Sequence, residues 1–144
     1  DIVDADFATE RDPVGLAQSF ADLNALIAQQ RASKALPIVL IGFSQGGALA
    51  LHTALRSTAN IAGVAALSAY LPPSDDYRKS AAAVFMAHGI YDDVVPIATA
   101  MRSKSALETL GYCVDWHEYP LGHQLSPALI VDLSAWLSAR LGGV

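Results

Sequence analysis

The residues best suited to chemistry begin with a serine between glycines, in the run Gly42-Phe43-Ser44-Gln45-Gly46. This G-x-S-x-G pattern is typical of a sharp strand-to-helix turn that exposes the serine hydroxyl as a nucleophile. Such a turn strains the serine backbone, and we expect side chains at Gly42 and Gly46 to collide with neighbouring backbone. The competing interpretation is an ordinary glycine-rich turn in which Ser44 is a helix N-cap. If Ser44 is the nucleophile, the Gln45 N–H at the helix N-terminus is the predicted oxyanion donor.

A serine hydroxyl is a weak nucleophile and needs a general base. Where this turn carries a catalytic serine, the chain order is serine, acid, histidine, each in a loop after a strand. His123 follows the last predicted strand and is therefore the predicted base. His52 lies inside the helix after the serine, and His117 lies inside a predicted strand. His88 ends a predicted strand, where we expect its imidazole to hold the following loop.

The acid is expected in the loop after the third predicted strand, where Asp92 and Asp93 are adjacent. A buried carboxylate there would orient the histidine and stabilise its protonated form. One of the two aspartates could instead cap the helix that Pro96 opens. The local sequence does not choose between them.

The elements that position these residues follow from hydrophobic periodicity and from cap signals. Apolar runs predict strands, and periodic segments bounded by Pro and Gly predict helices. The last helix is expected to bury Leu129, Ile130, Leu133, Trp136 and Leu137. The predicted strands are 36–42, 61–67, 83–87 and 113–119, and the predicted helices are 12–32, 45–56, 96–110 and 126–142. Strands that alternate with helices predict an α/β fold with a mostly parallel sheet covered on both faces.

The composition excludes several classes of partner. The chain has 144 residues, which is typical of one domain, and a formal net charge of −5. Without a Lys/Arg cluster, nucleic acid and anionic membranes are not expected partners. No apolar run reaches the ~18 residues of a membrane span, and no signal peptide is evident. The single cysteine, Cys113, fits a reducing compartment, so we expect a cytoplasmic protein.

Four segments resemble the phospholipase/carboxylesterase family of α/β-hydrolases, which includes acyl-protein thioesterases. They are GFSQGGALAL at 42–51, LSAYLP at 67–72, HGIYDDVVP at 88–96 and YPLGH at 119–123. The resemblance implies a metal-free, cofactor-free hydrolase with Ser44, Asp92 and His123 as its triad. It selects Asp92 because the family loop reads H-G-x-x-D-x-x-V-P. By resemblance, the stretch from Ser68 to Leu71 lines the acyl pocket.

The resemblance also implies that part of the family's fold precedes this chain. Family members open with several strands and a His-Gly-rich loop that donates a second oxyanion N–H. Residues 1–144 are therefore expected to be a single partial domain, the C-terminal part of an α/β-hydrolase. The strand at 36–42 would then have an open edge that a second copy could cover, as in a homodimer.

The expected function is a serine carboxylesterase that hydrolyses short-to-medium acyl esters through an acyl-enzyme. A thioesterase that acts on acylated proteins or acyl thioesters is the alternative, because the triad would be the same. The competing alternatives from other classes are a non-catalytic fragment and a binding module that retains only the fold, although all three triad residue types in the correct order argue against the binding module.

Overall fold

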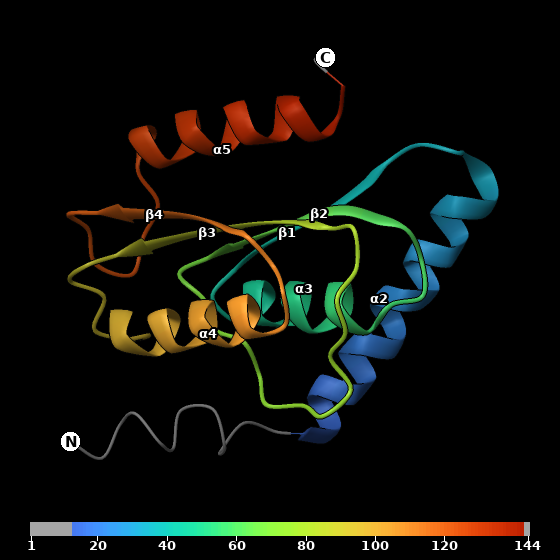
Figure 1. Ribbon diagram of the computed structural model, residues 1–144, viewed down its shortest axis with the longest axis horizontal. Helices are drawn as coiled ribbons and strands as arrows, with labels where there is room; N and C mark the ends of the chain where they lie inside the picture. Colours follow the sequence, from blue (N-terminus) through green and yellow to red (C-terminus); the bar gives the residue numbers. More distant parts are fainter. Residues whose placement is uncertain (1–12, 143–144) are drawn as a thin grey trace.

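The structure is a computed structural model that describes residues 13–142. Helices and strands alternate along this part of the chain (Figure 1): α2 (Pro13–Ser33), β1 (Ile38–Phe43), α3 (Gln45–Arg56), β2 (Ile61–Leu67), β3 (Ala83–Gly89), α4 (Ile97–Thr109), β4 (Val114–Tyr119) and α5 (Pro127–Arg140). The expected N-cap Asp12 and Gly143 lie outside the described residues. Within the described range, no helix is both long and apolar enough to cross a membrane.

The strands form one sheet in the order β1-β2-β3-β4, and each pairs in parallel with the next. Helices α3 and α4 lie on one face of this sheet and α5 lies on the other (Figure 1). The predicted α/β fold with a parallel sheet covered on both faces is therefore confirmed. Since all four strands run the same way, their carboxyl ends meet at one edge of the sheet.

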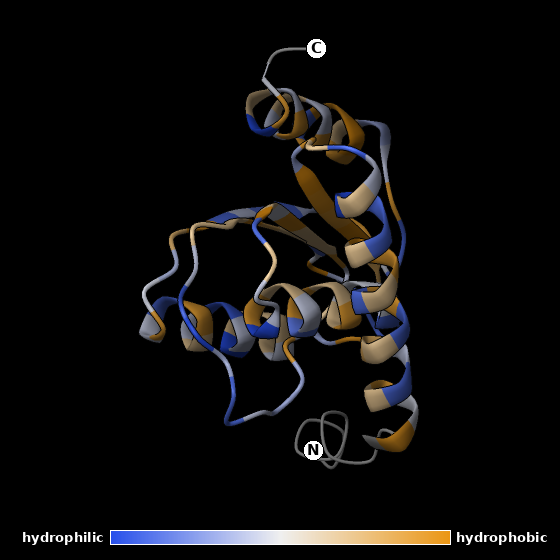
Figure 2. Ribbon diagram, turned by 90° about the vertical axis from the view of Figure 1, so that its right-hand side faces the viewer, coloured by the Kyte–Doolittle hydropathy of each residue, from blue (hydrophilic) through white to orange (hydrophobic). Residues whose placement is uncertain are grey.

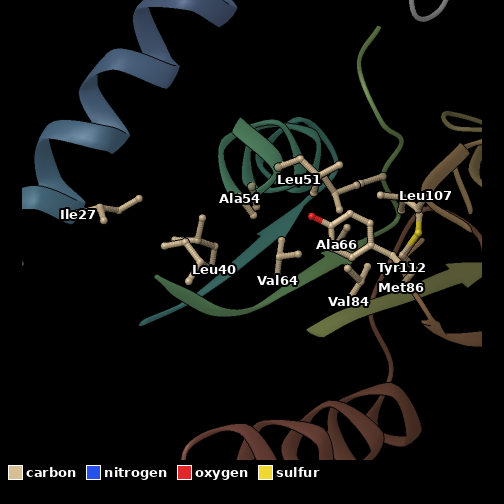
Figure 3. Close-up of a cluster of buried hydrophobic side chains, with 14 residues drawn as sticks. Ile27, Leu40, Leu51, Ala54, Val64, Ala66, Val84, Met86, Leu107 and Tyr112 are labelled. Carbon is tan, nitrogen blue, oxygen red and sulfur yellow. The ribbon is translucent and has the colours of Figure 1, made fainter. Parts of the chain in front are cut away.

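The core has two layers because side chains alternate along each strand. Along β2, Val64 and Ala66 face the α3 side, where they pack with Leu51 and Leu107. Figure 3 shows this cluster between α3 and the strands. The alternate residues of the strands pack against α5 on the other face. Figure 2 shows hydrophobic colouring along the strands, whereas the helices mix hydrophobic and hydrophilic residues.

The helix ends follow the expected cap chemistry. Gly111 lies directly after the C-cap of α4 with φ 99°, a backbone conformation that favours glycine. Its N–H bonds Glu108 O at 2.9 Å and the Tyr112 N–H bonds Leu107 O at 3.0 Å, which completes a Schellman motif. At the start of α5, Ser126 Oγ accepts a hydrogen bond from the Leu129 N–H at 3.2 Å.

The predicted burial of the apolar face of α5 was wrong for one residue. Leu129, Leu133 and Trp136 are buried as expected, but Ile130 is 45% exposed. Successive helical residues are about 100° apart around the axis, so Ile130 lies at the margin of the stripe centred on those three residues.

A buried histidine joins α3 to the long segment between β2 and β3. His52 Nδ1 lies 2.8 Å from Tyr77 Oη, and Tyr77 donates its own hydrogen to Pro72 O at 2.6 Å. Arg56 donates to His52 Nε2 at 3.0 Å, so the Nδ1–H form of the neutral ring satisfies every partner. Burial, and then the neighbouring Arg56 charge, lower the pKa of His52 and keep this ring neutral.

The turn between β1 and α3 has close contacts at two glycines. They are Gly42, as expected, and Gly47 in place of the expected Gly46. A Cβ at Gly42 would lie 2.1 Å from Gly46 O, so only glycine fits there. A Cβ at Gly46 would meet nothing within 4 Å, and the expected collision at Gly46 is therefore wrong. The second close approach is at Gly47, where a Cβ would lie 2.5 Å from the Ala69 Cβ. It would also lie 2.8 Å from Gly42 O, so the constraint at Gly47 comes both from a residue beyond β2 and from the turn itself.

Strand β1 forms an edge of the described sheet and is only partly covered. Ile41 and Phe43 point to the α5 side, where they remain 47% and 40% exposed. By contrast, six of the seven residues of β2 are buried. An apolar strand with an open edge can pair with another chain.

The glycine contacts predict two different outcomes for three alanine substitutions at the turn. We expect Gly42→Ala and Gly47→Ala each to destabilise the protein by about 1–3 kcal/mol or more, since backbone must move to admit the methyl group. We expect Gly46→Ala to be neutral or to stabilise by up to about 1 kcal/mol, because alanine favours the helix. Urea unfolding midpoints of the three variants measure this order. An equal loss in all three would contradict it.

The open edge of β1 predicts that residues 1–144, expressed alone, self-associate. Size-exclusion chromatography with light scattering should give a mass above the 15.1 kDa of one chain. We expect Ile41→Lys to shift the mass towards one chain, because a charge on an edge strand opposes pairing. Val131→Lys is the matched control, because Val131 is 67% exposed and lies on α5, not on a strand of the sheet. A wild-type chain that elutes as a monomer would refute the prediction.

Candidate active site

Ser44 occupies the turn between β1 and α3 with φ 55° and ψ −119°, a backbone conformation that residues other than glycine rarely adopt. Its N–H donates to Leu67 O at 2.8 Å, and its carbonyl accepts from the Ala48 N–H at 3.0 Å. The first bond anchors the turn to β2 and the second begins the helix. The strained backbone is therefore held by β2 on one side and α3 on the other.

His123 lies between Ser44 and Asp92 and is within hydrogen-bond distance of both. Its Nε2 is 3.0 Å from Ser44 Oγ, and its Nδ1 is 2.8 Å from Asp92 Oδ2. A carboxylate can only accept, so His123 Nδ1 carries the hydrogen and Nε2 offers a lone pair in the neutral ring. That lone pair can accept the Ser44 hydroxyl proton. The three side chains thus form one chain of hydrogen bonds.

The loop after β3, which contains Asp92 and is called the acid loop below, and the loop after β4, which contains His123, are joined through their backbones. The Ile90 N–H donates to Tyr119 O at 2.9 Å and the Tyr91 N–H donates to Leu121 O at 2.9 Å. At Gly89 the two loops approach so closely that a Cβ would lie 2.3 Å from Leu121 O. These contacts extend the β3–β4 pairing beyond the strands and bring the acid loop beside His123.

Asp92 and Asp93 have different environments, although they are adjacent. Asp92 is buried, and its Oδ1 accepts from the N–H groups of Val94 at 2.9 Å and Val95 at 2.8 Å. Asp93 is exposed. Neither aspartate caps α4, because Pro96 is the N-cap and no side chain bonds there. The loop conformation therefore directs the carboxylate of Asp92 towards His123.

Phe43 contributes a contact that the sequence analysis did not identify. Its ring centroid lies 4.8 Å from that of His123, at an interplanar angle of 44°. Phe43 occupies the first variable position of the G-x-S-x-G pattern and points to the α5 face of β1. It supports one side of the imidazole that bonds Ser44.

The other histidines make separate contacts. His52 belongs to the network of Tyr77 and Arg56 described above. His117 Nε2 lies 2.9 Å from Asp115 Oδ1, and its ring stacks on Phe85 at 4.8 Å. His88 bonds Val95 O through Nε2 at 2.7 Å, so its imidazole holds the acid loop as expected.

The backbone N–H of Gln45 is at the first position of α3. The first N–H groups of a helix lack an intrahelical acceptor and lie at the positive end of the helix dipole. Because Gln45 follows Ser44 directly, this N–H lies next to the serine at the N-terminal end of α3.

Leu71 lies after β2 and lines a groove of about 490 Å³ along α4, together with Tyr70, Pro72, Arg102 and Ser103. The Leu71 N–H donates to Ser103 Oγ at 2.8 Å, which fixes this segment to the helix. Ser44, Asp92 and His123 are not among the residues that line this groove.

Residues 13–142 contain no group of three or more His, Cys, Asp or Glu side chains arranged to hold a metal ion.

The chain is similar in sequence and in structure to known proteins. The sequence profile of the Phospholipase/Carboxylesterase family matches residues 1–141. The chain is 35% identical over 143 residues to acyl-protein thioesterase 1 of Gibberella zeae, which covers 90% of this chain and 60% of that protein. Among solved structures, Arabidopsis thaliana SOBER1 superposes with a TM-score of 0.83 at 26% identity, covering 90% of this chain and 66% of that one. Esterase PE8 has a TM-score of 0.80 at 28% identity and covers 92% and 67%.

The chain spans about three fifths of the length of the curated fungal thioesterases it matches. The family match extends over nearly the whole sequence and includes all three side chains of the hydrogen-bonded chain. The protein therefore belongs to the phospholipase/carboxylesterase family of α/β-hydrolases.

Proposed function

We propose that this chain carries the catalytic triad of a serine carboxylesterase, with Ser44 as nucleophile, His123 as general base and Asp92 as the orienting acid. The observation that carries the proposal is the continuous hydrogen bonding from Ser44 Oγ through His123 to Asp92. Family membership supports hydrolysis as the reaction class. The proposal uses only side chains and backbone groups of the chain.

In the first step, His123 Nε2 takes the hydroxyl proton as Ser44 Oγ forms a bond to the ester carbonyl carbon. The carbonyl π electrons move to oxygen, and the Gln45 N–H stabilises the resulting oxyanion. The imidazolium of His123 is stabilised by the carboxylate of Asp92, which itself stays ionised.

In the second step, the carbon–oxygen bond to the alcohol breaks and His123 Nε2 returns its proton to the leaving oxygen. Ser44 now carries the acyl group as an ester. Water then attacks the acyl carbon while His123 accepts its proton, and the carboxylic acid leaves as Ser44 regains its hydrogen. Each proton therefore passes through the same nitrogen.

The substrate is proposed to be a short-to-medium acyl ester with little demand on the alcohol. Leu71 is proposed to contact the acyl group. A thioester is the second candidate, because the Gibberella zeae relative is an acyl-protein thioesterase. Turnover of an ester and a thioester with the same acyl chain, compared across acyl lengths, distinguishes the two substrate classes.

The serine assignment predicts that Ser44→Ala abolishes ester turnover in the full-length protein with little loss of stability. Removing a hydroxyl from a partly exposed turn leaves no core cavity, and the residual rate should reflect only binding and oxyanion donors. Turnover of a p-nitrophenyl ester and labelling by a fluorophosphonate probe measure the effect. A mutant that keeps near-normal turnover would remove Ser44 from the mechanism, and a wild-type protein without labelling or turnover would favour a non-catalytic fragment.

The acid assignment predicts that Asp92→Asn lowers kcat by about 10²-fold or more, because an amide cannot hold the required histidine tautomer. Asp93→Asn is the matched control, since the exposed Asp93 carries the same charge one residue away. It should leave kcat close to that of the wild type. Equal effects of the two substitutions on kcat would show that charge alone matters and that Asp92 has no special position.

A further inference from the structure

His88 lies at the end of β3, directly before the acid loop, and only 1% of it is exposed. Its Nε2 is 2.7 Å from Val95 O, at the far end of that loop. Val95 is itself fully buried, so its carbonyl has no access to water. One side chain thus joins the two ends of the loop that contains Asp92.

The proton on His88 is fixed by this contact. A carbonyl oxygen only accepts, so His88 Nε2 must donate and carries the hydrogen. Burial is the main cause that lowers the pKa of His88, which favours the neutral ring. His88 is therefore a fixed donor, whereas His123 exchanges a proton with Ser44 in the proposed reaction.

The same nitrogen also lies beside the acid. His88 Nε2 is 3.4 Å from Asp92 Oδ2, the oxygen that accepts from His123 Nδ1 at 2.8 Å. The other oxygen of Asp92 accepts from the Val95 N–H. The peptide groups on both sides of Val95 are therefore held, one by Asp92 and the other by His88.

We propose that His88 is a positioning residue that keeps the acid loop closed and thereby directs Asp92 Oδ2 at His123 Nδ1. Its importance for turnover rests on the proposed function, but its effect on the Asp92–His123 hydrogen bond does not. Without the His88 donor, the buried Val95 carbonyl loses its partner, and the loop must shift to satisfy it. Since Asp92 Oδ1 bonds the N–H of the same residue, the carboxylate shifts with the loop. A displacement on the order of 1 Å is enough to lower a rate by about 10²-fold.

The test uses proton NMR of the full-length protein, in which a hydrogen-bonded imidazole Nδ1–H gives a resolved downfield signal. Asp92→Asn assigns the His123 signal by removing it. His88→Phe keeps a ring of similar shape without a donor, and we expect it to lose or shift this signal and to lower kcat about 10- to 100-fold. His88→Gln restores an amide N–H at the reach of Nε2, and we expect it to keep the signal and to retain kcat within about threefold.

His52→Phe is the matched control, because it also removes a buried, hydrogen-bonded neutral histidine but lies on α3. It should keep the His123 signal, whatever it does to stability. If His88→Phe does not fold, His88→Asn takes its place, since the shorter amide cannot reach Val95 O. The proposal is overturned if a folded His88→Phe or His88→Asn keeps the signal, or if a folded His88→Gln loses it.

Failure of the proposed function would look different. A wild-type protein that shows the downfield signal but neither hydrolyses esters nor reacts with a fluorophosphonate would refute the esterase proposal. The variants at His88 would still test the positioning role, because the signal requires no turnover.

Discussion

A single imidazole has to reach two side chains on opposite sides of its ring, and this requirement governs the arrangement of three loops. His123 bonds Ser44 at 3.0 Å and Asp92 at 2.8 Å, so neither neighbour can move far without losing its contact. The parallel sheet meets this demand because the carboxyl ends of its strands share one edge. Backbone bonds then fix the loops to one another, including Tyr91 N–H to Leu121 O and Ser44 N–H to Leu67 O.

Much of this frame could be predicted from the sequence because its signals are local. Short β-branched runs between periodic segments mark the strands, and proline, glycine and serine mark the helix ends. Once the strands are parallel, Ser44, the acid loop and His123 must meet at one edge. The choice of Asp92 over Asp93 could not be predicted in this way. Both side chains have the same chemistry, and only the fold of the loop buries one and exposes the other.

The features that could not be predicted from the local sequence depend on contacts between distant segments. The closest contact that requires glycine at position 47 is with Ala69, which lies beyond the next strand. The exposure of Ile130 depends on where the sheet meets α5, because the helical pattern alone places it beside Leu129. Leu71 was expected by resemblance to line the acyl pocket, and the groove that it lines is formed with α4, which begins 26 positions further along the chain. In each case the deciding neighbour is absent from the local pattern.

The histidines illustrate why residue type alone does not identify a base. His52 and His88 each bond partners that fix one neutral tautomer, and burial lowers the pKa of both. Neither can gain a proton without placing a second donor against Arg56 or a positive charge in the core. His123 differs because 17% of its side chain remains exposed, a hydroxyl faces one nitrogen and a carboxylate faces the other. The carboxylate of Asp92 lies beside both rings, but it is closer to His123 Nδ1, at 2.8 Å, than to His88 Nε2, at 3.4 Å. The neighbours of His52 and His88 therefore favour one state of each ring, whereas the proposed base His123 faces a hydroxyl that can give up a proton and a carboxylate that would stabilise the resulting charge.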